Sequence, residues 1–317
     1  MKENVLTVVG TLTEAQLEEL ETICKENDYG FTRVNSVAEA EPYLKDVTII
    51  YGNSAELIKK APGLKWFHSA SAGVNTYIPV IKEETLLTNS AGAFGLSIAE
   101  HTVMVILMML RQMPQYQKYI GERQWKKGLS QESIYGKRIT VLGTGDIGSH
   151  IAERLQGFKP ACITGVSRSG KKKEFFDQCY PVTEINRLLP DTDILITCIP
   201  ETGETINLLN EERISLLPED AYVVNVGRGS LIDEEALMKA LNSGKLAGAA
   251  LDVFRTEPLP EDSPLYETKN LIITPHCSGN LTLDYTKETN YNQFKDNLIH
   301  YANNEPLEHV VDKKLGY

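Results

Sequence analysis

An arginine, a glutamate and a histidine follow short apolar segments in the second half of the sequence. Arg228 comes after AYVVNVG, Glu257 after GAALDVFRT, and His276 after NLIITP. If these segments are parallel strands of one sheet, their carboxyl ends share an edge, and the three side chains gather there. Taken singly, Arg228 could cap a loop, Glu257 could be a surface acid, and His276 could be a packed histidine.

Together the three side chains could reduce a 2-oxo acid. A guanidinium is planar and permanently charged, so Arg228 can hold a carboxylate and polarise the neighbouring carbonyl. A histidine, with an ordinary pKa of about 6.5, can give a proton to the carbonyl oxygen or take it back in the reverse reaction. A carboxylate beside it favours the imidazolium and fixes its orientation. We therefore predict Arg228, Glu257 and His276 as catalytic residues, with Arg228 also binding substrate.

A glycine-rich turn in ITVLGTGDIGSHIAERLQGF could hold the cofactor that such a reduction needs. The turn follows an apolar strand and precedes an amphipathic helix. Gly143 permits the tight turn, Gly145 lets the backbone approach a pyrophosphate, and Gly148 lets the helix lie close to the sheet. The start of the helix offers free N–H groups and a positive dipole end. The predicted dinucleotide-binding residues here are Gly143, Thr144, Gly145, Asp146, Ile147 and Gly148.

The end of the next apolar segment, ACITGVSR, indicates which dinucleotide is held. An NAD site would have a carboxylate there for the ribose hydroxyls, whereas this chain has Ser167, Arg168 and Ser169, with Lys171 and Lys172 behind them. Hydroxyl and guanidinium donors suit a 2′-phosphate. We therefore predict that NADP(H) is favoured. The alternative is that Arg168 stacks on adenine and NAD(H) is accepted as well.

The elements that must position these residues alternate between strand and helix patterns. The first hundred residues contain the strand candidates VLTVVG, VTIIYG and LKWFHSASAGVN, and six more run from KRITVLG to NLIITPH, with a further edge strand near 180–183. Their near-continuous hydrophobicity is typical of parallel strands covered on both faces. The sequence predicts an α/β fold with a parallel sheet in each half. The polar helical segment after Leu283 is expected to return to the first half.

Two helix starts are predicted from capping boxes. Thr13 and Gln16 form one, ahead of EAQLEELETICKEN, and Ser97 with Glu100 forms the other. The helix after Ser97, through Arg111, is apolar nearly all round and must be buried on several sides. It lies either between domains or subunits, or inside the core of one domain.

Composition and charge exclude several classes of partner. The chain has 317 residues, 42% hydrophobic, with a formal charge of −11, which argues against binding a nucleic-acid backbone. The longest apolar run, 103–110, is too short to cross a bilayer, and no signal peptide is visible. Five cysteines lack metal-ligand spacing, so we expect no metal site and reduced thiols in the cytoplasm.

Four motifs, GTGDIG, NVGRGSLIDEEAL, LDVFRTEPLP and TPHCSG, occur in the order typical of D-isomer-specific 2-hydroxyacid dehydrogenases. The chain resembles that family over essentially its whole length. The resemblance implies two Rossmann-like domains with the active site in the cleft between them. The dinucleotide-binding domain would be 99–284, and the substrate-binding domain 1–98 plus 285–317. A homodimer, with the long helix at its interface, is also implied.

The same resemblance implies further contacts. SAGVN matches the loop that binds the substrate carboxylate through backbone N–H groups, here those of Ala72 and Gly73, although Asn75 replaces a common acid. SRS is similar to the NADP-preferring glyoxylate and hydroxypyruvate reductases of the family. The remaining cofactor contacts that the resemblance implies are Pro200, Thr205, Asp252, His276 and Gly279.

Other functions stay open on the sequence alone. A dinucleotide-sensing regulator, as in the related corepressor proteins, could keep the same Arg, Glu and His. Formate dehydrogenase pairs its histidine with a glutamine, whereas Glu257 stands here. Phosphoglycerate dehydrogenase would need a cationic cluster near SASAGVN, and none is evident. The substrate is expected to be a small 2-oxo acid or its 2-hydroxy acid, while bulkier acids are not excluded.

Overall fold

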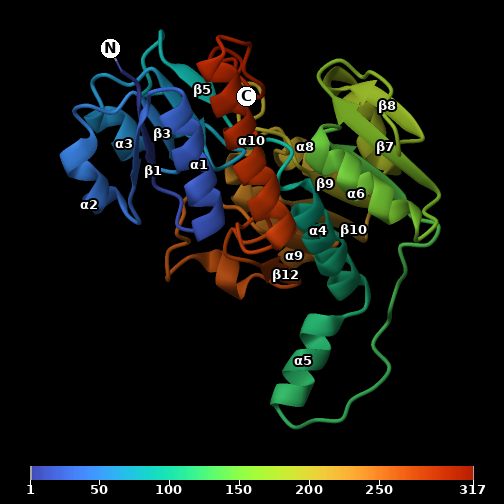
Figure 1. The fold of residues 1–317 in the computed structure, drawn as a ribbon. Helices are drawn as coiled ribbons and strands as arrows, with labels where there is room; N and C mark the ends of the chain where they lie inside the picture. The colour runs from blue at the N-terminus through green and yellow to red at the C-terminus, as the bar shows by residue number, and fades with distance from the viewer. Residues whose placement is uncertain (1, 317) are drawn as a thin grey trace. The chain divides into compact units, whose positions relative to one another are not determined.

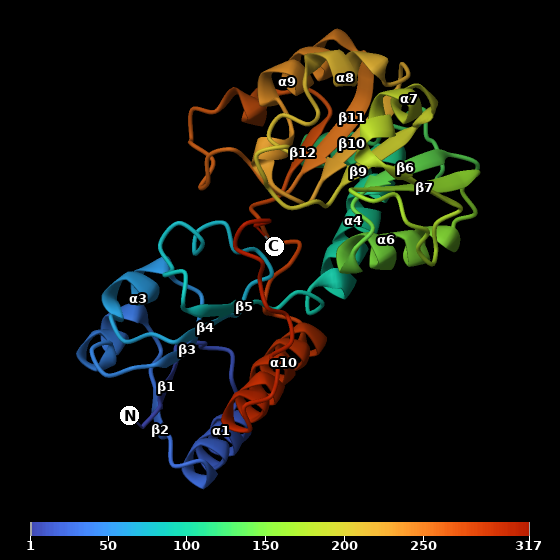
Figure 2. The same ribbon diagram turned by 90° about the horizontal axis from the view of Figure 1, so that it is seen from above.

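The computed structural model describes residues 2–316 and divides the chain into two compact units. Unit 1 comprises Met1–Phe94 and Asn280–Tyr317, and unit 2 comprises Gly95–Gly279. Each unit contains a parallel sheet with helices on both faces, which confirms the predicted α/β class (Figures 1 and 2). The expected cleft between domains stays a prediction.

Unit 1 is built on a five-stranded parallel sheet in the order β2-β1-β3-β4-β5. Its strands are β1 (Asn4–Thr7), β2 (Gly30–Arg33), β3 (Ile49–Gly52), β4 (Trp66–Ser69) and β5 (Leu86–Thr88). Its helices are α1 (Glu14–Glu26), α2 (Val37–Ala40), α3 (Ala55–Lys60) and α10 (Asp284–Ala302). The predicted capping box at Thr13 and Gln16 is confirmed at the start of α1.

Successive residues of a strand point to opposite faces of the sheet, and helices bury both faces here. In β4, Phe67 packs into the core on the α3 side, whereas Trp66 packs with Phe294 and Leu20 on the side of α1 and α10. Figure 2 shows α1 and α10 lying together on that face. Helix α10 therefore completes unit 1, as expected for the segment after Leu283.

Unit 2 is built on a seven-stranded parallel sheet in the order β12-β11-β10-β9-β6-β7-β8. Its strands are β6 (Arg138–Leu142), β7 (Cys162–Ser167), β8 (Gln178–Pro181), β9 (Ile194–Thr197), β10 (Ala221–Asn225), β11 (Leu246–Leu251) and β12 (Leu271–Ile273). Its helices are α4 (Gly95–Leu110), α5 (Met113–Gly121), α6 (Asp146–Gln156), α7 (Ile185–Leu188), α8 (Glu211–Leu216) and α9 (Glu234–Ser243). The strand order reverses between β6 and β9, where doubly wound sheets place their ligands.

Helix α4 begins three residues earlier than the sequence predicted, so the capping box at Ser97 is wrong. The helix starts at Gly95, and Ser97 is a buried residue of its first turn. A Cβ at Gly95 would collide with His150 and Asp146 of α6. The close packing of α4 on α6 therefore sets the start of the helix, overriding the local capping pattern.

An arm extends from the end of α4 and comprises α5 with the segment through Ser133 (Figure 1). It is closed at its base by Glu132 N, which donates to Leu110 O over 2.8 Å, and by Arg111 Nε, which donates to Gln131 Oε1 over 2.9 Å. Apolar side chains on the arm and on α4 are solvent-exposed, among them Met104, Ile120 and Trp125, of which Trp125 is 82% exposed. Helix α4 is thus not an enclosed core helix within unit 2.

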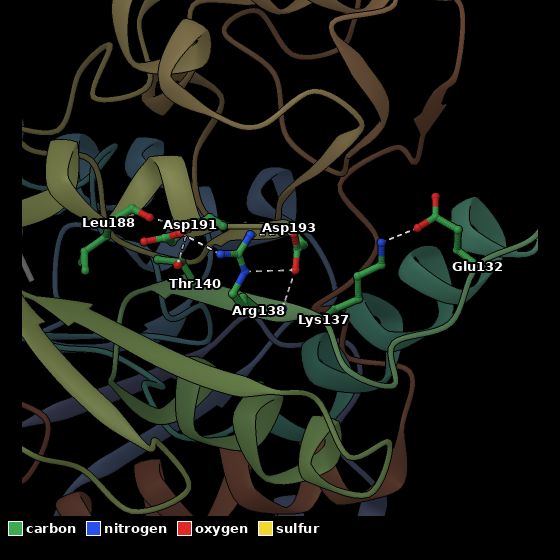
Figure 3. A network of polar contacts seen from close by, with 8 residues as sticks. Glu132, Lys137, Arg138, Thr140, Leu188, Asp191 and Asp193 are labelled. Atoms are coloured by element: carbon green, nitrogen blue, oxygen red, sulfur yellow. Dashed lines mark hydrogen bonds and ion pairs between the residues drawn. The ribbon is translucent and has the colours of Figure 1, made fainter.

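The amino end of β6 is tied to the start of β9 by charges (Figure 3). Arg138 Nη1 lies 2.6 Å from Asp191 Oδ1, and the Arg138 backbone N donates to Asp193 Oδ2 over 2.7 Å. Lys137 pairs with Glu132 at the base of the arm. Since these groups are partly exposed and lie at the end of β6 opposite the glycine-rich turn, we assign them to strand alignment.

Candidate active site

The glycine-rich turn joins β6 to α6 and has the geometry that a dinucleotide requires. Gly143 has a φ of 114°, which L side chains rarely adopt. A Cβ at Gly148 would collide with Gly143 O, so glycine lets α6 lie close to the turn. At Gly145 a Cβ would meet no described atom within 4 Å, which leaves the backbone open to a ligand.

The start of α6 suits an anion. The helix begins at Asp146, and its N-cap residue, Gly145, makes no side-chain cap hydrogen bond. The backbone N–H group of Ile147 in the first turn therefore stands beside the positive end of the dipole. Thr144 is buried against Gly165, and its carbonyl accepts from Ser149. These features fit the pyrophosphate of a dinucleotide.

The end of β7 lies beside this turn, because Gly143 N donates to Val166 O over 2.8 Å. Ser167 Oγ accepts from Gly170 N over 3.1 Å, which folds the chain back tightly. Arg168 and Ser169 are exposed on this fold, and the exposed residues Lys171–Lys173 follow. Cationic and hydroxyl groups thus stand where an NAD site would carry an acid.

The turn that bears Arg228 is fixed by a buried asparagine at the end of β10. Asn225 Nδ2 donates to Arg228 O over 2.9 Å, and Asn225 Oδ1 accepts from Gly227 N and from Thr197 Oγ1. Arg228 Nη1 in turn donates to Gly227 O over 2.7 Å. A polar residue that is only 1% exposed, Asn225, therefore holds the arginine's backbone in place.

Two neighbouring carboxylates face the charge of Arg228. A Cβ at Gly229 would collide with the Phe254 backbone, so glycine lets this turn press against the segment that carries Glu257. Burial lowers the pKa of Arg228, while the charges of Glu201 and Glu257 act to raise it. The guanidinium thus lies within electrostatic range of both carboxylates.

Glu257 and His276 form a direct pair. His276 Nδ1 lies 2.7 Å from Glu257 Oε2, and Glu257 Oε1 accepts from Phe254 N over 2.8 Å. An ionised carboxylate can only accept, so Nδ1 carries the hydrogen in this contact and Nε2 is left for other chemistry. The His276 side chain is 51% exposed, so Nε2 is open to a substrate.

The turn that carries His276 is organised around the buried carboxylate of Asp252. His276 has a φ of 50°, and its N–H donates to Asp252 O over 2.9 Å. Thr274 Oγ1 and Cys277 N donate to Asp252 Oδ1, while the N–H and hydroxyl of Ser278 donate to Oδ2. These four donors occupy the acceptor positions of the Asp252 carboxylate, so Asp252 stabilises the turn that carries His276.

The other predicted cofactor contacts lie at strand ends of the same unit. Thr205 Oγ1 donates to Pro200 O over 2.9 Å and accepts from Thr202 N, which closes the turn after β9. Gly279 ends unit 2, three residues after His276. Pro200 is exposed and Thr205 is half-buried, so both remain accessible in this unit.

The predicted carboxylate loop lies in unit 1, directly after β4. The backbone N–H groups of Ala72 and Gly73 have no acceptor within residues 2–316, and both residues are half-buried. Tyr51 of β3 is a core residue. Its ring stacks on Phe294 at 4.3 Å, and its hydroxyl bonds to Asn290.

Sequence reasoning missed the residues that hold these groups in position. Glu201, Asn225 and the buried His68 of unit 1 were not identified. The partners of Glu201 and His68 lie 20 to 29 residues away along the chain, whereas Asn225 bonds to Gly227 and Arg228 close by. Asn225 did stand in the quoted motif NVGRGSLIDEEAL. A buried-strand asparagine directly before a glycine-rich turn is the signal that could have identified it.

Comparison with known proteins places this site in a family. The profile of the D-isomer specific 2-hydroxyacid dehydrogenase NAD-binding domain matches residues 103–278. A glyoxylate reductase from Thermofilum pendens is 36% identical over 232 residues, covering 71% of this chain and 68% of the relative.

Solved structures of other proteins match this chain over nearly its full length. A D-isomer specific 2-hydroxyacid dehydrogenase family protein from Aeromonas salmonicida superposes with a TM-score of 0.87 at 33% identity, covering 99% of this chain and all of that one. A second match is the NADPH-dependent glyoxylate/hydroxypyruvate reductase of Sinorhizobium meliloti, solved with NADP and sulfate. Its TM-score is 0.83 at 25% identity, and the match covers all of both chains. Some solved relatives hold NADP or NADPH and others hold NAD. The chain belongs to the D-isomer specific 2-hydroxyacid dehydrogenase family.

Proposed function

We propose that this protein reduces a small 2-oxo acid to the D-2-hydroxy acid with NADPH. The observation that carries the proposal is the contact between His276 Nδ1 and Glu257 Oε2, with Arg228 in electrostatic range of the same carboxylate. One unit therefore brings together a proton donor, its carboxylate partner and a fixed cation. The glyoxylate reductases among its relatives support the choice of reaction.

Each residue of this trio has a distinct part in the proposed reaction. A dinucleotide held by the glycine-rich turn would supply the hydride that the carbonyl carbon needs. Arg228 holds the substrate and stabilises the charge that develops on the carbonyl oxygen. His276 gives the Nε2 proton to that oxygen. Before this transfer Glu257 stabilises the imidazolium, and it holds the ring in place through Nδ1.

The substrate carboxylate is proposed to bind to unit 1. The N–H groups of Ala72 and Gly73 have no acceptor among the described residues, and two adjacent free donors suit an anion. Glyoxylate and hydroxypyruvate are the substrates we expect first.

The preference for NADP(H) is proposed from the end of β7. Arg168 is exposed next to the glycine-rich turn, and Ser167 and Ser169 flank it with hydroxyls. A guanidinium attracts a 2′-phosphate, whereas the acid of an NAD site would repel it. Since solved relatives hold either cofactor, these residues carry the argument.

A panel of 2-oxo acids tests the activity. Purified protein is mixed with NADPH or NADH and with glyoxylate, hydroxypyruvate, pyruvate or branched 2-oxo acids, and oxidation of the cofactor is followed. We expect turnover of the small acids, higher kcat/KM with NADPH, and a D-configured product where the carbon is chiral. If every acid leaves the cofactor reduced, the regulatory alternative on the same fold takes the place of an enzyme.

We also propose a cytoplasmic homodimer. The apolar side chains exposed on α4 and the arm, Met104, Met113 and Ile120 among them, would be covered by a second copy. Analytical ultracentrifugation should show a dimer for the wild type and for Tyr266→Asp, which changes an exposed side chain elsewhere in unit 2. Ile120→Asp should give monomer. A wild-type monomer at micromolar concentration would contradict the dimer.

A further inference from the structure

A chain of buried hydrogen bonds runs along β4 and β5 to the carboxylate loop of unit 1. Trp66 Nε1 donates to Thr88 Oγ1 over 2.8 Å, and the same oxygen lies 2.7 Å from His68 Nδ1. On the other side of the ring, His68 Nε2 lies 3.4 Å from Ser90 Oγ, which donates to Ser69 O over 2.8 Å. All five residues are 0% exposed, so water cannot replace any of these partners.

The donors and acceptors fix the direction of this chain. An indole N–H can only donate, so Thr88 Oγ1 accepts from Trp66. A hydroxyl oxygen can accept twice, but among the described residues His68 Nδ1 is the one acceptor within reach of the Thr88 hydroxyl hydrogen, so this hydroxyl donates to Nδ1. Nδ1 is therefore an acceptor, and the ring carries its hydrogen on Nε2. That hydrogen points at Ser90 Oγ, whose own hydrogen is used on Ser69 O. The arrangement is satisfied throughout only when His68 is neutral.

The hydrogen-bond chain ends on a loop in which four successive carbonyl groups, at residues 69–72, are held from within unit 1. The donors are Ser90 Oγ to Ser69 O, Asn290 Nδ2 to Ala70 O, Ser90 N to Ser71 O, and Asn89 Nδ2 to Ala72 O. With these four carbonyls engaged, the N–H groups of Ala72 and Gly73 remain without an acceptor among the described residues. Ser90 supplies two of the four bonds, one from its side chain and one from its backbone.

We propose that His68 is a positioning residue for substrate binding: through Ser90 it holds the loop that presents the Ala72 and Gly73 N–H groups. The inference rests on the proposed role of those N–H groups toward a 2-oxo acid carboxylate. His68 touches neither substrate nor cofactor. It acts as a neutral Nε2–H donor that orients the Ser90 hydroxyl, and so the Ser69 carbonyl at the start of the loop.

Two substitutions separate this role from simple packing. His68→Gln keeps an amide N–H near the position of Nε2 and so can still donate to Ser90. His68→Asn is shorter, can replace only the Nδ1 link to Thr88, and leaves Ser90 without its donor. Ser90→Ala removes the donor to Ser69 O and should behave like His68→Asn.

Steady-state kinetics with glyoxylate and NADPH provide the first readout. We expect KM for glyoxylate to rise about 3- to 10-fold in His68→Asn and Ser90→Ala, the loss typical of one neutral hydrogen bond. The KM for NADPH should stay unchanged, and His68→Gln should restore the wild-type value for glyoxylate. Equal KM values for glyoxylate in all four proteins would overturn the proposal, as would equal rises in His68→Gln and His68→Asn.

Two measurements on the resting protein keep the inference separate from the proposed activity. NMR of nitrogen-15-labelled histidine should show His68 as the neutral Nε2–H tautomer, and amide exchange at Ala70, Ser71 and Ser90 should quicken in His68→Asn but not in His68→Gln. An Nδ1–H or charged ring, or unchanged exchange in His68→Asn, refutes the positioning role even if the enzyme is active. If these results hold but no 2-oxo acid is reduced, only the proposed function fails.

Discussion

Each unit places a histidine at the carboxyl end of a parallel strand, and the two surroundings are opposite. His276 follows β12 with its side chain 51% exposed and a carboxylate oxygen 2.7 Å from Nδ1. His68 lies in β4, is 0% exposed, and has hydroxyl oxygens at both ring nitrogens. Burial and, to a smaller extent, the charge of His309 together lower the pKa of His68 to about 3.

The difference shows how surroundings divide one residue type between two tasks. A histidine that must gain and lose a proton needs access to its substrate and a carboxylate that tolerates the charged form. A histidine that must hold a structure needs a dry site in which only the neutral form is satisfied. Four experiments test this account, and the variant expected to lose the most activity comes first.

Removing the exposed histidine should have the largest effect. His276→Ala is expected to lower kcat by about 100- to 10,000-fold, the usual contribution of general acid catalysis. Binding of NADPH, followed by fluorescence titration, should be unchanged because the glycine-rich turn is intact. Wild-type kcat in this variant would remove the assigned role.

Loss of the fixed cation should come next. Arg228→Ala is expected to reduce kcat/KM for glyoxylate by about 100- to 1,000-fold, since the carboxylate and the developing oxyanion lose their charged partner. Arg187→Ala, which removes an exposed arginine paired with Glu184, is the matched control and should retain activity. A change confined to cofactor affinity would contradict the placement of Arg228.

The buried histidine should make unit 1 sensitive to acid. Its folded pKa of about 3 lies below the unfolded value of about 6.5, so the unfolded chain alone takes up a proton between these values. The contribution of neutral His68 to the free energy of unfolding is complete above pH 6.5 and is lost as the pH falls toward 3. The loss amounts to about 2 kcal/mol by pH 5.

Urea unfolding between pH 7 and pH 5 measures this loss. The fluorescence of Trp66, whose ring lies 6.2 Å from that of His68, reports on unit 1, and Trp125 can be replaced by Phe to remove its background. His68→Gln should show a loss on acidification smaller by about 2 kcal/mol. Parallel profiles for the two proteins would mean that His68 does not titrate in this way.

The smallest of the four effects concerns the cofactor. Arg168→Ala is expected to lower the preference for NADPH over NADH by about 10-fold, because the 2′-phosphate loses a charged hydrogen-bond partner. Lys173→Ala, at an exposed lysine farther along, should change the ratio little. A wild-type enzyme that prefers NADH would contradict the assignment.

Much of this architecture could be predicted from the sequence because buried parallel strands are continuously apolar. ITVL and DILIT are such strands, and a side chain at Gly143 or Gly148 of the turn would be strained or would collide. Strand β2, GFTR, was missed because it is only half-buried, and β5 because it has three residues. The start of α4 was misplaced because close packing on α6, and not a local cap, determines it.

The candidate site likewise contains residues that could be predicted from the sequence and residues that could not. Arg228, Glu257 and His276 could be selected because each follows an apolar strand, and strand ends of one sheet share an edge. Asn225 holds the Arg228 turn through bonds to residues two and three positions away, which a local pattern could have indicated. Asp252 holds the histidine turn through tertiary hydrogen bonds that no local pattern encodes. His68 was hidden for the same reason, since Thr88 and Ser90 lie about twenty residues further on.

The most direct test of the central claim is a crystal structure with NADPH and oxamate, an unreactive analogue of a 2-oxo acid. We predict that the oxygen standing for the substrate carbonyl lies within about 2.6–3.2 Å of His276 Nε2 and also contacts the Arg228 guanidinium. An analogue bound with that oxygen turned away from both side chains would contradict the proposed reaction.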